Sequence, residues 1–277
     1  MTLFRSLAAA LLLGLTFTAQ ALPAASNVPG GVALIKLGAI SASSSAPRAR
    51  FGEQRVWVVA DHGLWLAVVG LALDLPPGPH ELAVDDGDGE RTLVFAVREK
   101  RYPEQHITLK DSSKVTLSDE DATRAIAEIA TIGQLKRHWR ETDDSERTDN
   151  DFQLPAKGRL ASRFGLRRFF NGEMRAPHSG LDLAVGRGTP IGASAPGQVL
   201  AVGDYFFNGR TVFVDHGNGL ISMYCHLERI DVAAGDAVAR GQRVGRSGMS
   251  GRASGPHLHW SVILNGSMVD PELFVKR

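Results

Sequence analysis

The chain has 277 residues, of which 43% are hydrophobic and 22% are charged, and its formal net charge is +1. This is the composition of a globular protein, and the length allows about two domains. The single cysteine, Cys225, excludes an intramolecular disulfide. Charge is unevenly distributed, since residues 1–150 have 16 basic and 20 acidic side chains whereas residues 151–277 have 15 and 10. A basic C-terminal half suits an anionic polymer or an acidic partner such as the N-terminal half, but chance explains the difference equally well.

The first 21 residues have the pattern of a secretory signal peptide. Arg5 supplies the positive charge, residues 7–17 form a short apolar core, and Ala19-Gln20-Ala21 is a small-x-small cleavage site. An apolar run of about 11 residues is much shorter than the roughly 20 that cross a bilayer. No cysteine follows the cleavage site, which argues against a lipoprotein. We therefore expect an exported protein, periplasmic or secreted, with no membrane span after cleavage.

Residues 27–108 predict a small N-terminal β-sandwich. Short runs rich in β-branched and aromatic residues lie at 55–60, 65–70 and 92–97, and clusters of proline, glycine and aspartate separate them. Strands of this length at this spacing are typical of an all-β domain. The histidines of this region share no spacing and are interpreted as surface or packing residues: His62, His80 and His106.

Residues 109–150 predict one helix followed by a linker. Ser118 precedes the acidic residues 119–121 and supplies the cap, basic residues lie at 136, 137 and 140, and isoleucine or leucine recurs at 126, 129, 132 and 135. This pattern predicts a capped amphipathic helix over 118–140, and the charged stretch 143–150 indicates the linker. Residues 151–277 are rich in glycine and turn motifs, which predicts an antiparallel-sheet domain almost free of helix. The expected fold class is therefore mainly β.

The C-terminal domain carries the parts of a hydrolytic zinc site. His257 and His259 alternate, so on a strand both side chains point to one face, about 6–7 Å apart. One imidazole can then bind a metal while the other lies beside the water that the metal activates. A turn through Gly180 brings His178 and Asp182 into one coordination sphere. Two histidines and one carboxylate leave a tetrahedral zinc with an open fourth position, which is typical of a catalytic site.

Residues 152–275, about 45% of the chain, resemble the lysostaphin-type (LytM-type) zinc metalloendopeptidases, which cut peptide cross-links in bacterial peptidoglycan. The N-terminal part resembles, less closely, the small β-domain that precedes the peptidase in some exported members. Besides the histidine motifs, the segments that carry the resemblance are 162–167, 188–193, 197–199, 238–245 and 250–252.

The resemblance implies that His178, Asp182 and His259 hold one zinc ion and that His226 and His257 flank the open position. Zinc would lower the pKa of water from 15.7 to about 7. One flanking histidine, His257 by preference, would take the proton of that water, and His226 would donate a hydrogen bond to the developing oxyanion. The division of labour between these two histidines is left open by the sequence.

Three further residues are candidates for substrate binding. Tyr224 lies two positions before His226 and is expected on the same strand face, where it would line the groove or help to hold the oxyanion. Arg163 and Arg167 either bind substrate carboxylates or pair with acidic neighbours. By the same alternation, the Cys225 side chain is expected to be a buried structural thiol that points away from the site.

The function expected from these features is that of a secreted zinc endopeptidase acting on peptidoglycan, as a D,D-endopeptidase where the cross-links are direct diaminopimelate linkages. The alternatives are a non-catalytic activator of cell-wall amidases, as in members that have lost their ligands, or a peptidase for glycine-rich proteins. A biotinyl or lipoyl carrier is excluded, because residues 158–275 contain no lysine to modify. No nucleic-acid partner is expected.

The role of the N-terminal region has two equally supported interpretations. It can cover the groove together with the helix, with a polar side chain in the fourth zinc position, so that the chain inhibits itself. It can instead be a spacer or a wall-binding module. The charge contrast between the halves and the linker at 143–150 motivate the first hypothesis.

Overall fold

The computed structural model describes residues 22–41, 45–108, 117–142, 148 and 151–275. The expected signal peptide over 1–21 and most of the expected linker lie outside these ranges. Within them the chain is mostly β-strand with a single α-helix, so the mainly β prediction is confirmed. No helix of the described ranges is both long enough and apolar enough to cross a membrane.

The N-terminal half forms a six-stranded antiparallel sheet in the order β1-β4-β3-β2-β5-β6. The strands form one continuous hydrogen-bonded path in which sequence neighbours pair through short turns, except for the β1–β4 and β2–β5 pairs. Both faces of this sheet are apolar, because along β4 alternate residues enter two different hydrophobic clusters. The strands are β1 (Val32–Ala39), β2 (Arg48–Phe51), β3 (Gln54–Asp61), β4 (Leu64–Gly70), β5 (Gly78–Asp85) and β6 (Glu90–Val97).

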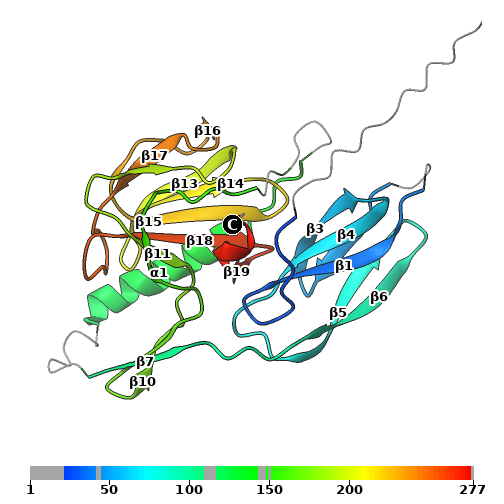
Figure 1. The fold of residues 1–277 in the computed structure, drawn as a ribbon, viewed down its shortest axis with the longest axis horizontal. Coiled ribbons are helices and arrows are strands. Elements are labelled where there is room, and N and C mark those ends of the chain that lie inside the picture. Colours follow the sequence, from blue (N-terminus) through cyan, green and yellow to red (C-terminus); the bar gives the residue numbers. More distant parts are fainter. Residues whose placement is uncertain (1–21, 42–44, 109–116, 143–147, 149–150, 276–277) are drawn as a thin grey trace, which may run out of the picture.

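The strand β7 (Glu104–Ile107) leaves this sheet and joins the C-terminal half. It pairs in parallel with β9 (Arg167–Phe170), which forms a hairpin with β10 (Glu173–Met174). Local sequence patterns cannot reveal this pairing, because its two strands lie about 60 positions apart in the chain. The end of the N-terminal region is thereby tied to the segment that precedes His178 (Figure 1).

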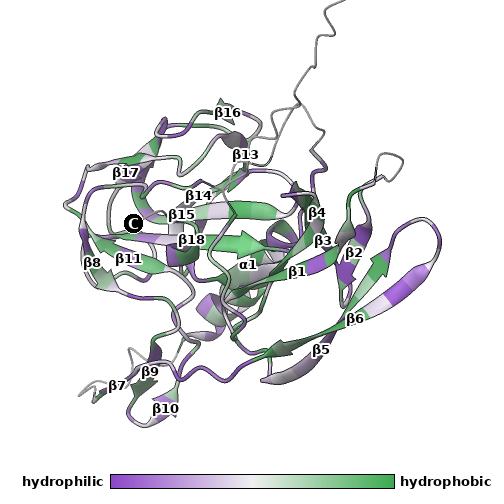
Figure 2. Cartoon of the chain, turned by 45° about the vertical axis from the view of Figure 1, so that its right-hand side comes forward, coloured by the Kyte–Doolittle hydropathy of each residue, from purple (hydrophilic) through white to green (hydrophobic). Residues whose placement is uncertain are grey.

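The C-terminal half is built on an antiparallel sheet with the central order β16-β13-β14-β15-β18-β11-β8. Strand β12 pairs with β17, and β19 pairs with β18. Figure 2 shows apolar residues along the central strands β15 and β18. The strands are β8 (Arg159–Ser162), β11 (Leu181–Ala184), β12 (Pro190–Gly192), β13 (Gly197–Tyr205), β14 (Gly209–Asp215), β15 (Leu220–Ile230), β16 (Ala237–Val238), β17 (Arg243–Ser247), β18 (Leu258–Leu264) and β19 (Ser267–Val269).

The helix α1 (Asp119–Lys136) begins after Ser118, whose side chain accepts a hydrogen bond from the Asp121 amide. This is the N-cap that the sequence predicts. The apolar stripe is only partly buried, since Ile132 and Leu135 pack against the C-terminal sheet. The other two stripe residues, Ile126 and Ile129, are 69% and 58% exposed.

The two halves share one hydrophobic core. The face of the N-terminal sheet that carries Trp57 and Val68 belongs to the same cluster as Val262 and Leu264 of β18. At this junction the side chain of Asn265 bonds both backbone groups of Gly70, accepting from its amide at 2.6 Å and donating to its carbonyl at 3.2 Å. The N-terminal sheet is therefore fixed to the end of β18, beside the C-terminal sheet (Figure 1).

Candidate metal centre

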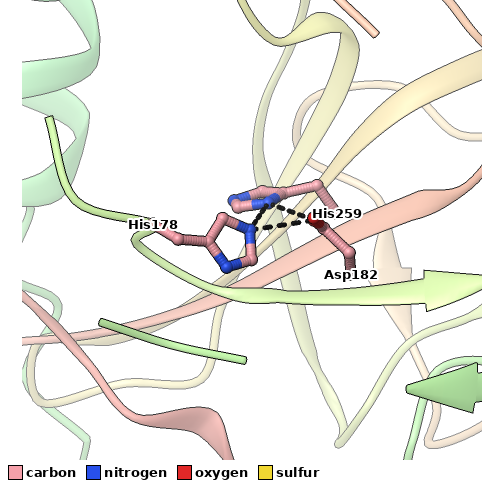
Figure 3. A group of neighbouring side chains, drawn as sticks. All are labelled: His178, Asp182 and His259. Atoms are coloured by element: carbon pink, nitrogen blue, oxygen red, sulfur yellow. Dashed lines mark hydrogen bonds and ion pairs between the residues drawn. The ribbon is translucent and has the colours of Figure 1, made fainter. Parts of the chain in front are cut away.

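The strands β11 and β18 place two candidate ligands opposite each other. Asp182 is the direct antiparallel partner of His259, and residues opposite one another on neighbouring strands project from the same face. The neighbours of Asp182 on β11, Leu181 and Leu183, point to the other face and are buried in the core. His178 approaches from the turn that precedes β11, so the three side chains converge (Figure 3).

The three ligand atoms form a small triangle. Asp182 Oδ1 lies 2.9 Å from His178 Nε2 and 2.9 Å from His259 Nδ1, and the two nitrogens are 3.0 Å apart. Each residue thus offers one atom to a common point, which is the arrangement that one metal ion requires. The sequence-based prediction that these three residues come together is matched by this geometry.

The other nitrogen of each ligand histidine has its own partner. His178 Nδ1 donates to the Arg163 carbonyl at 2.8 Å, and His259 Nε2 lies 2.9 Å from Ser261 Oγ. The Arg163 carbonyl fixes the His178 tautomer with the lone pair on Nε2, and the Ser261 hydroxyl orients the His259 ring with Nδ1 toward the triangle. Ser261 was missed from the sequence, although its position two residues after His259 on a strand places both on one face.

Electrostatics keep Asp182 and His259 in the protonation states that bind a metal. Burial raises the pKa of Asp182, but the adjacent His178 and His259 side chains outweigh it and hold this pKa well below its ordinary value. Burial lowers the pKa of His259. Asp182 is therefore ionised and His259 neutral at pH 7, which are the forms that coordinate metals.

His226 and His257 lie side by side next to this triangle, with ring centroids 4.7 Å apart. His226 Nδ1 donates to the Ser250 carbonyl at 2.9 Å, and His257 Nδ1 donates to the Gly255 carbonyl at 2.8 Å. Each neutral ring therefore presents an unprotonated Nε2, and His257 Nε2 lies 3.8 Å from Asp182 Oδ1. Burial, followed by the neighbouring His259, lowers the pKa of His226 to about 4.

The prediction that Tyr224 lines the groove is wrong. Tyr224 is fully buried on the opposite face of the sheet, where its hydroxyl accepts a hydrogen bond from the Ser194 amide at 2.7 Å. The alternation fails because His226 has a φ of +61°, and the β15–β17 register shifts just beyond it. Such an irregularity separates residues that simple alternation would place on one face.

Cys225 is buried, as expected, but its orientation is the reverse of the prediction. It lies opposite His259 in the β15–β18 pair, so its thiol is on the same face as the metal triangle. Burial raises the pKa of this thiol to about 12. Cys225 is therefore a protonated packing residue beneath the site.

The two arginines expected near the site both contact carboxylates of the chain. Arg163 pairs with Glu272, and Arg167 pairs with Glu104 of β7 at 2.9 Å. The acidic-neighbour alternative thus describes both side chains in this structure. No sequence pattern singles out Arg168, whose guanidinium lies 3.9 Å from Asp182 Oδ2 and 3.3 Å from Ser162 Oγ.

Comparison with known proteins matches both halves to one family. Residues 176–271 match the model of peptidase family M23, and residues 25–100 match that of the peptidase family M23 N-terminal domain. A crystal structure from Pseudomonas aeruginosa assigned to peptidase M23 is 42% identical. It covers 90% of this chain, is itself covered to 95%, and superimposes with a TM-score of 0.73.

The curated relatives match less than half of this chain. The peptidoglycan DD-endopeptidase ShyA of Vibrio cholerae is 39% identical over 129 residues, which are 46% of this chain and 30% of ShyA. The DD-carboxypeptidase/endopeptidase Mpg of Neisseria meningitidis is 37% identical over 113 residues, 41% of this chain and 26% of Mpg. The chain thus spans less than a third of the length of these two relatives. Because the Pseudomonas structure is matched over nearly its full length, the chain belongs to peptidase family M23.

Proposed function

We propose that this protein is an exported zinc endopeptidase that hydrolyses peptide cross-links of bacterial peptidoglycan, as a D,D-endopeptidase. The observation that carries the proposal is the His178–Asp182–His259 triangle with two further histidines beside it. The names of the relatives, which include two DD-endopeptidases of Vibrio cholerae, support the choice of substrate.

The ligand atoms fit one zinc ion. Tetrahedral zinc with bonds of 2.0–2.1 Å separates its ligand atoms by about 3.3 Å, and the observed separations are 2.9–3.0 Å. A small outward movement of the three side chains therefore suffices. His178, Asp182 and His259 would hold the ion, which when bound supplies the Lewis acidity that makes water a nucleophile at neutral pH.

We assign proton transfer to His257. A group that accepts a proton from water and passes it to the leaving amine must carry that proton between the two steps. Burial makes this unfavourable for His226, whose pKa is lowered to about 4, whereas the His257 side chain is 20% exposed and its Nε2 is free.

His226 then serves as an acceptor that orients the attacking water. Its Nδ1–H is engaged by the Ser250 carbonyl, so the neutral ring has no proton on Nε2 with which to stabilise an oxyanion. This assignment replaces the hydrogen-bond donor role expected from the sequence. Substrate binding by Arg163 and Arg167 stays a prediction.

Self-inhibition by a side chain in the fourth metal position gains no support from the described residues. Within them, all hydrogen bonds to the three ligand side chains come from residues 162–261. We propose instead that the N-terminal half is a fixed part of the substrate-binding surface, since it shares a core with the peptidase half.

The test is digestion of purified cross-linked muropeptides by the full mature chain, followed by mass spectrometry. We expect conversion of dimers to monomers, loss of cleavage with a chelator, and recovery on addition of zinc. The isosteric variant Asp182→Asn is the control, because it removes the anionic ligand without changing side-chain volume. A zinc-loaded protein that leaves muropeptides intact would contradict the proposal and favour an amidase activator or a peptidase for glycine-rich proteins.

A further inference from the structure

A cavity of about 1130 Å³ lies between the two halves of the chain. Its lining includes Pro177 and Ser179, the two residues on either side of the ligand His178. Its other walls come from the N-terminal half, through residues 72–77, 99–102 and 104, from the last residue of α1, Lys136, and from residues 165, 167, 174 and 266–268 of the C-terminal half. The cavity therefore exists only because the two halves are docked together.

The wall between the halves is built around Tyr102. Its hydroxyl donates to the Pro29 carbonyl at 2.7 Å, and its ring packs edge-on against Phe164. A Cβ added to Gly165 would lie 2.0 Å from the Tyr102 ring, so only glycine permits this contact. The Gly165 amide in turn donates to the His178 carbonyl at 2.7 Å. The cavity wall is thus joined directly to the backbone of a metal ligand.

Most charges that line the cavity have partners. Arg167 bonds Glu104 at 2.9 Å, and Arg101 bonds Glu99 at 3.4 Å. The ammonium of Lys100 lies 4.0 Å from Asp270 and 4.5 Å from the centre of the Tyr102 ring.

Lys136 is the exception among the lysines and arginines of this lining. It is half-buried, and the structure gives its ammonium no hydrogen-bond acceptor and no carboxylate within 4.0 Å among the described residues. Burial, followed by the neighbouring Arg137, lowers the pKa of Lys136, whereas Asp74 acts in the opposite direction. A partly desolvated ammonium without an acceptor is unfavourable, and a carboxylate from a ligand would satisfy it.

We propose that this cavity is the subsite for one arm of the cross-linked peptide, and that Lys136 binds a free carboxylate of that arm. The proposal rests on the proposed function, because the stem peptides joined by such cross-links carry free carboxylates and short apolar side chains. The apolar part of the lining suits methyl and methylene groups better than sugar hydroxyls. It consists of Leu73, Leu75, Pro76, Met174 and Met268. The N-terminal half would then select the substrate, which makes Lys136 a specificity residue outside the peptidase sheet.

The experiment compares wild type with Lys136→Met, and with Lys136→Arg as the conservative rescue. The control is Lys36→Met, because Lys36 is an exposed lysine of β1 outside the cavity. The probes are a stem tetrapeptide with a free C-terminal carboxylate and the same peptide as its C-terminal amide. Binding is measured by calorimetry on zinc-loaded full-length protein, and zinc content and unfolding midpoint verify that each variant is folded.

We expect Lys136→Met to weaken binding of the free acid about tenfold and to leave binding of the amide unchanged, because charged hydrogen bonds of this kind contribute about one tenfold step or more. Lys136→Arg should restore the preference, and Lys36→Met should match wild type. Equal binding of the acid by wild type and Lys136→Met, or no binding by wild type, would overturn the subsite.

The two proposals fail in different ways. Wild-type protein that binds the acid through Lys136 but cleaves no cross-link would retain the subsite and refute the peptidase function. Cleavage of cross-links with the same KM for wild type and Lys136→Met would retain the peptidase function and refute the subsite.

Discussion

Hydrogen bonds to the second nitrogen of each ligand histidine decide how the site holds its metal. His259 can offer Nδ1 because its Nε2 is bound to Ser261, and His178 can offer Nε2 because its Nδ1 donates to a backbone carbonyl. The backbone carbonyl cannot be removed by substitution, but the serine hydroxyl can. The contribution of these partners is therefore measurable at one position.

We predict that Ser261→Ala lowers zinc affinity by about 10–100-fold, the usual cost of losing such a partner. The three ligands remain in place, so the variant should still bind one zinc at saturation. Competition with a fluorescent chelator gives the dissociation constant, and Ser254→Ala in the exposed loop before His257 is the control. Unchanged affinity in Ser261→Ala would mean that packing alone orients the His259 ring.

The buried His226 predicts a pH dependence of stability for the metal-free protein. Its pKa is about 4 in the folded chain, because of burial first and of His259 second, whereas an unfolded histidine titrates near 6.5. Between these values the unfolded chain binds a proton at this position and the folded chain does not, so stability falls as the pH falls from 6.5 toward 4.

For His226 alone this loss amounts to about 2 kcal/mol between pH 8 and pH 5. This contribution of His226 is isolated by urea unfolding of the metal-free wild type and of His226→Gln at both pH values. The other histidines titrate in both proteins, so their effect cancels. The difference in unfolding free energy between the two proteins should shrink at pH 5 by about this amount. A difference independent of pH would show that His226 is hydrated and protonated in the folded state.

At the scale of elements, the sequence predicts those parts of the site that depend on local geometry. Alternation places His257 and His259 on one face, and the turn through Gly180 brings His178 to Asp182. It fails at Tyr224, because a backbone irregularity at His226 leaves no mark in the residue pattern. The meeting of His178 and Asp182 with His259, 77 positions beyond Asp182, was implied by the family resemblance and not by local geometry. The orientation of β15 around His226 is visible only in the structure.

The helix α1 and the strand β7 show that local sequence patterns also predict only part of the fold. The capping residue Ser118 and the stripe of α1 are local, so the helix was predicted within a few residues of its bounds. How much of the stripe is buried depends on where α1 meets the sheet, and Ile126 lies beyond that contact. The pairing of β7 with β9 depends on docking of the two halves, which no local pattern encodes.

Gly165 contacts Tyr102 of the N-terminal half and hydrogen-bonds the backbone of the ligand His178, so it links the two halves at the metal site. Its φ is +80°, and a Cβ would collide with the Tyr102 ring at 2.0 Å. We predict that Gly165→Ala destabilises the protein by about 2–4 kcal/mol, of which about 1 kcal/mol is backbone strain and the rest overpacking. Urea unfolding measures the total.

Gly172→Ala is the matched control. Gly172 has a φ of +85°, but nothing lies within 4 Å of its added Cβ, so this variant carries the strain without the collision. The difference between the two variants is then the cost of moving Tyr102 away from the His178 segment. Equal destabilisation by both variants would indicate that the Tyr102 side chain moves aside without energetic cost and that the cavity wall is easily deformed.

At the scale of the whole molecule, the shared core predicts that the two halves unfold together. Neighbouring valines of β4 allow a matched test, because both are fully buried and they point to opposite faces of the N-terminal sheet. Val68 belongs to the core shared with β18, whereas Val69 belongs to the cluster inside the N-terminal half. Each Val→Ala change removes the same atoms and should cost about 1–3 kcal/mol.

The variants should differ in where the structure opens. Hydrogen exchange measured by mass spectrometry should show loss of protection in residues 258–269 for Val68→Ala, since the Asn265–Gly70 junction loses its support. Val69→Ala should leave these amides protected until global unfolding, because its cavity lies inside the N-terminal sheet. If Val68→Ala affected the N-terminal amides alone, the halves would be independent units, and a wall that moves apart from the peptidase sheet could not hold a subsite beside His178.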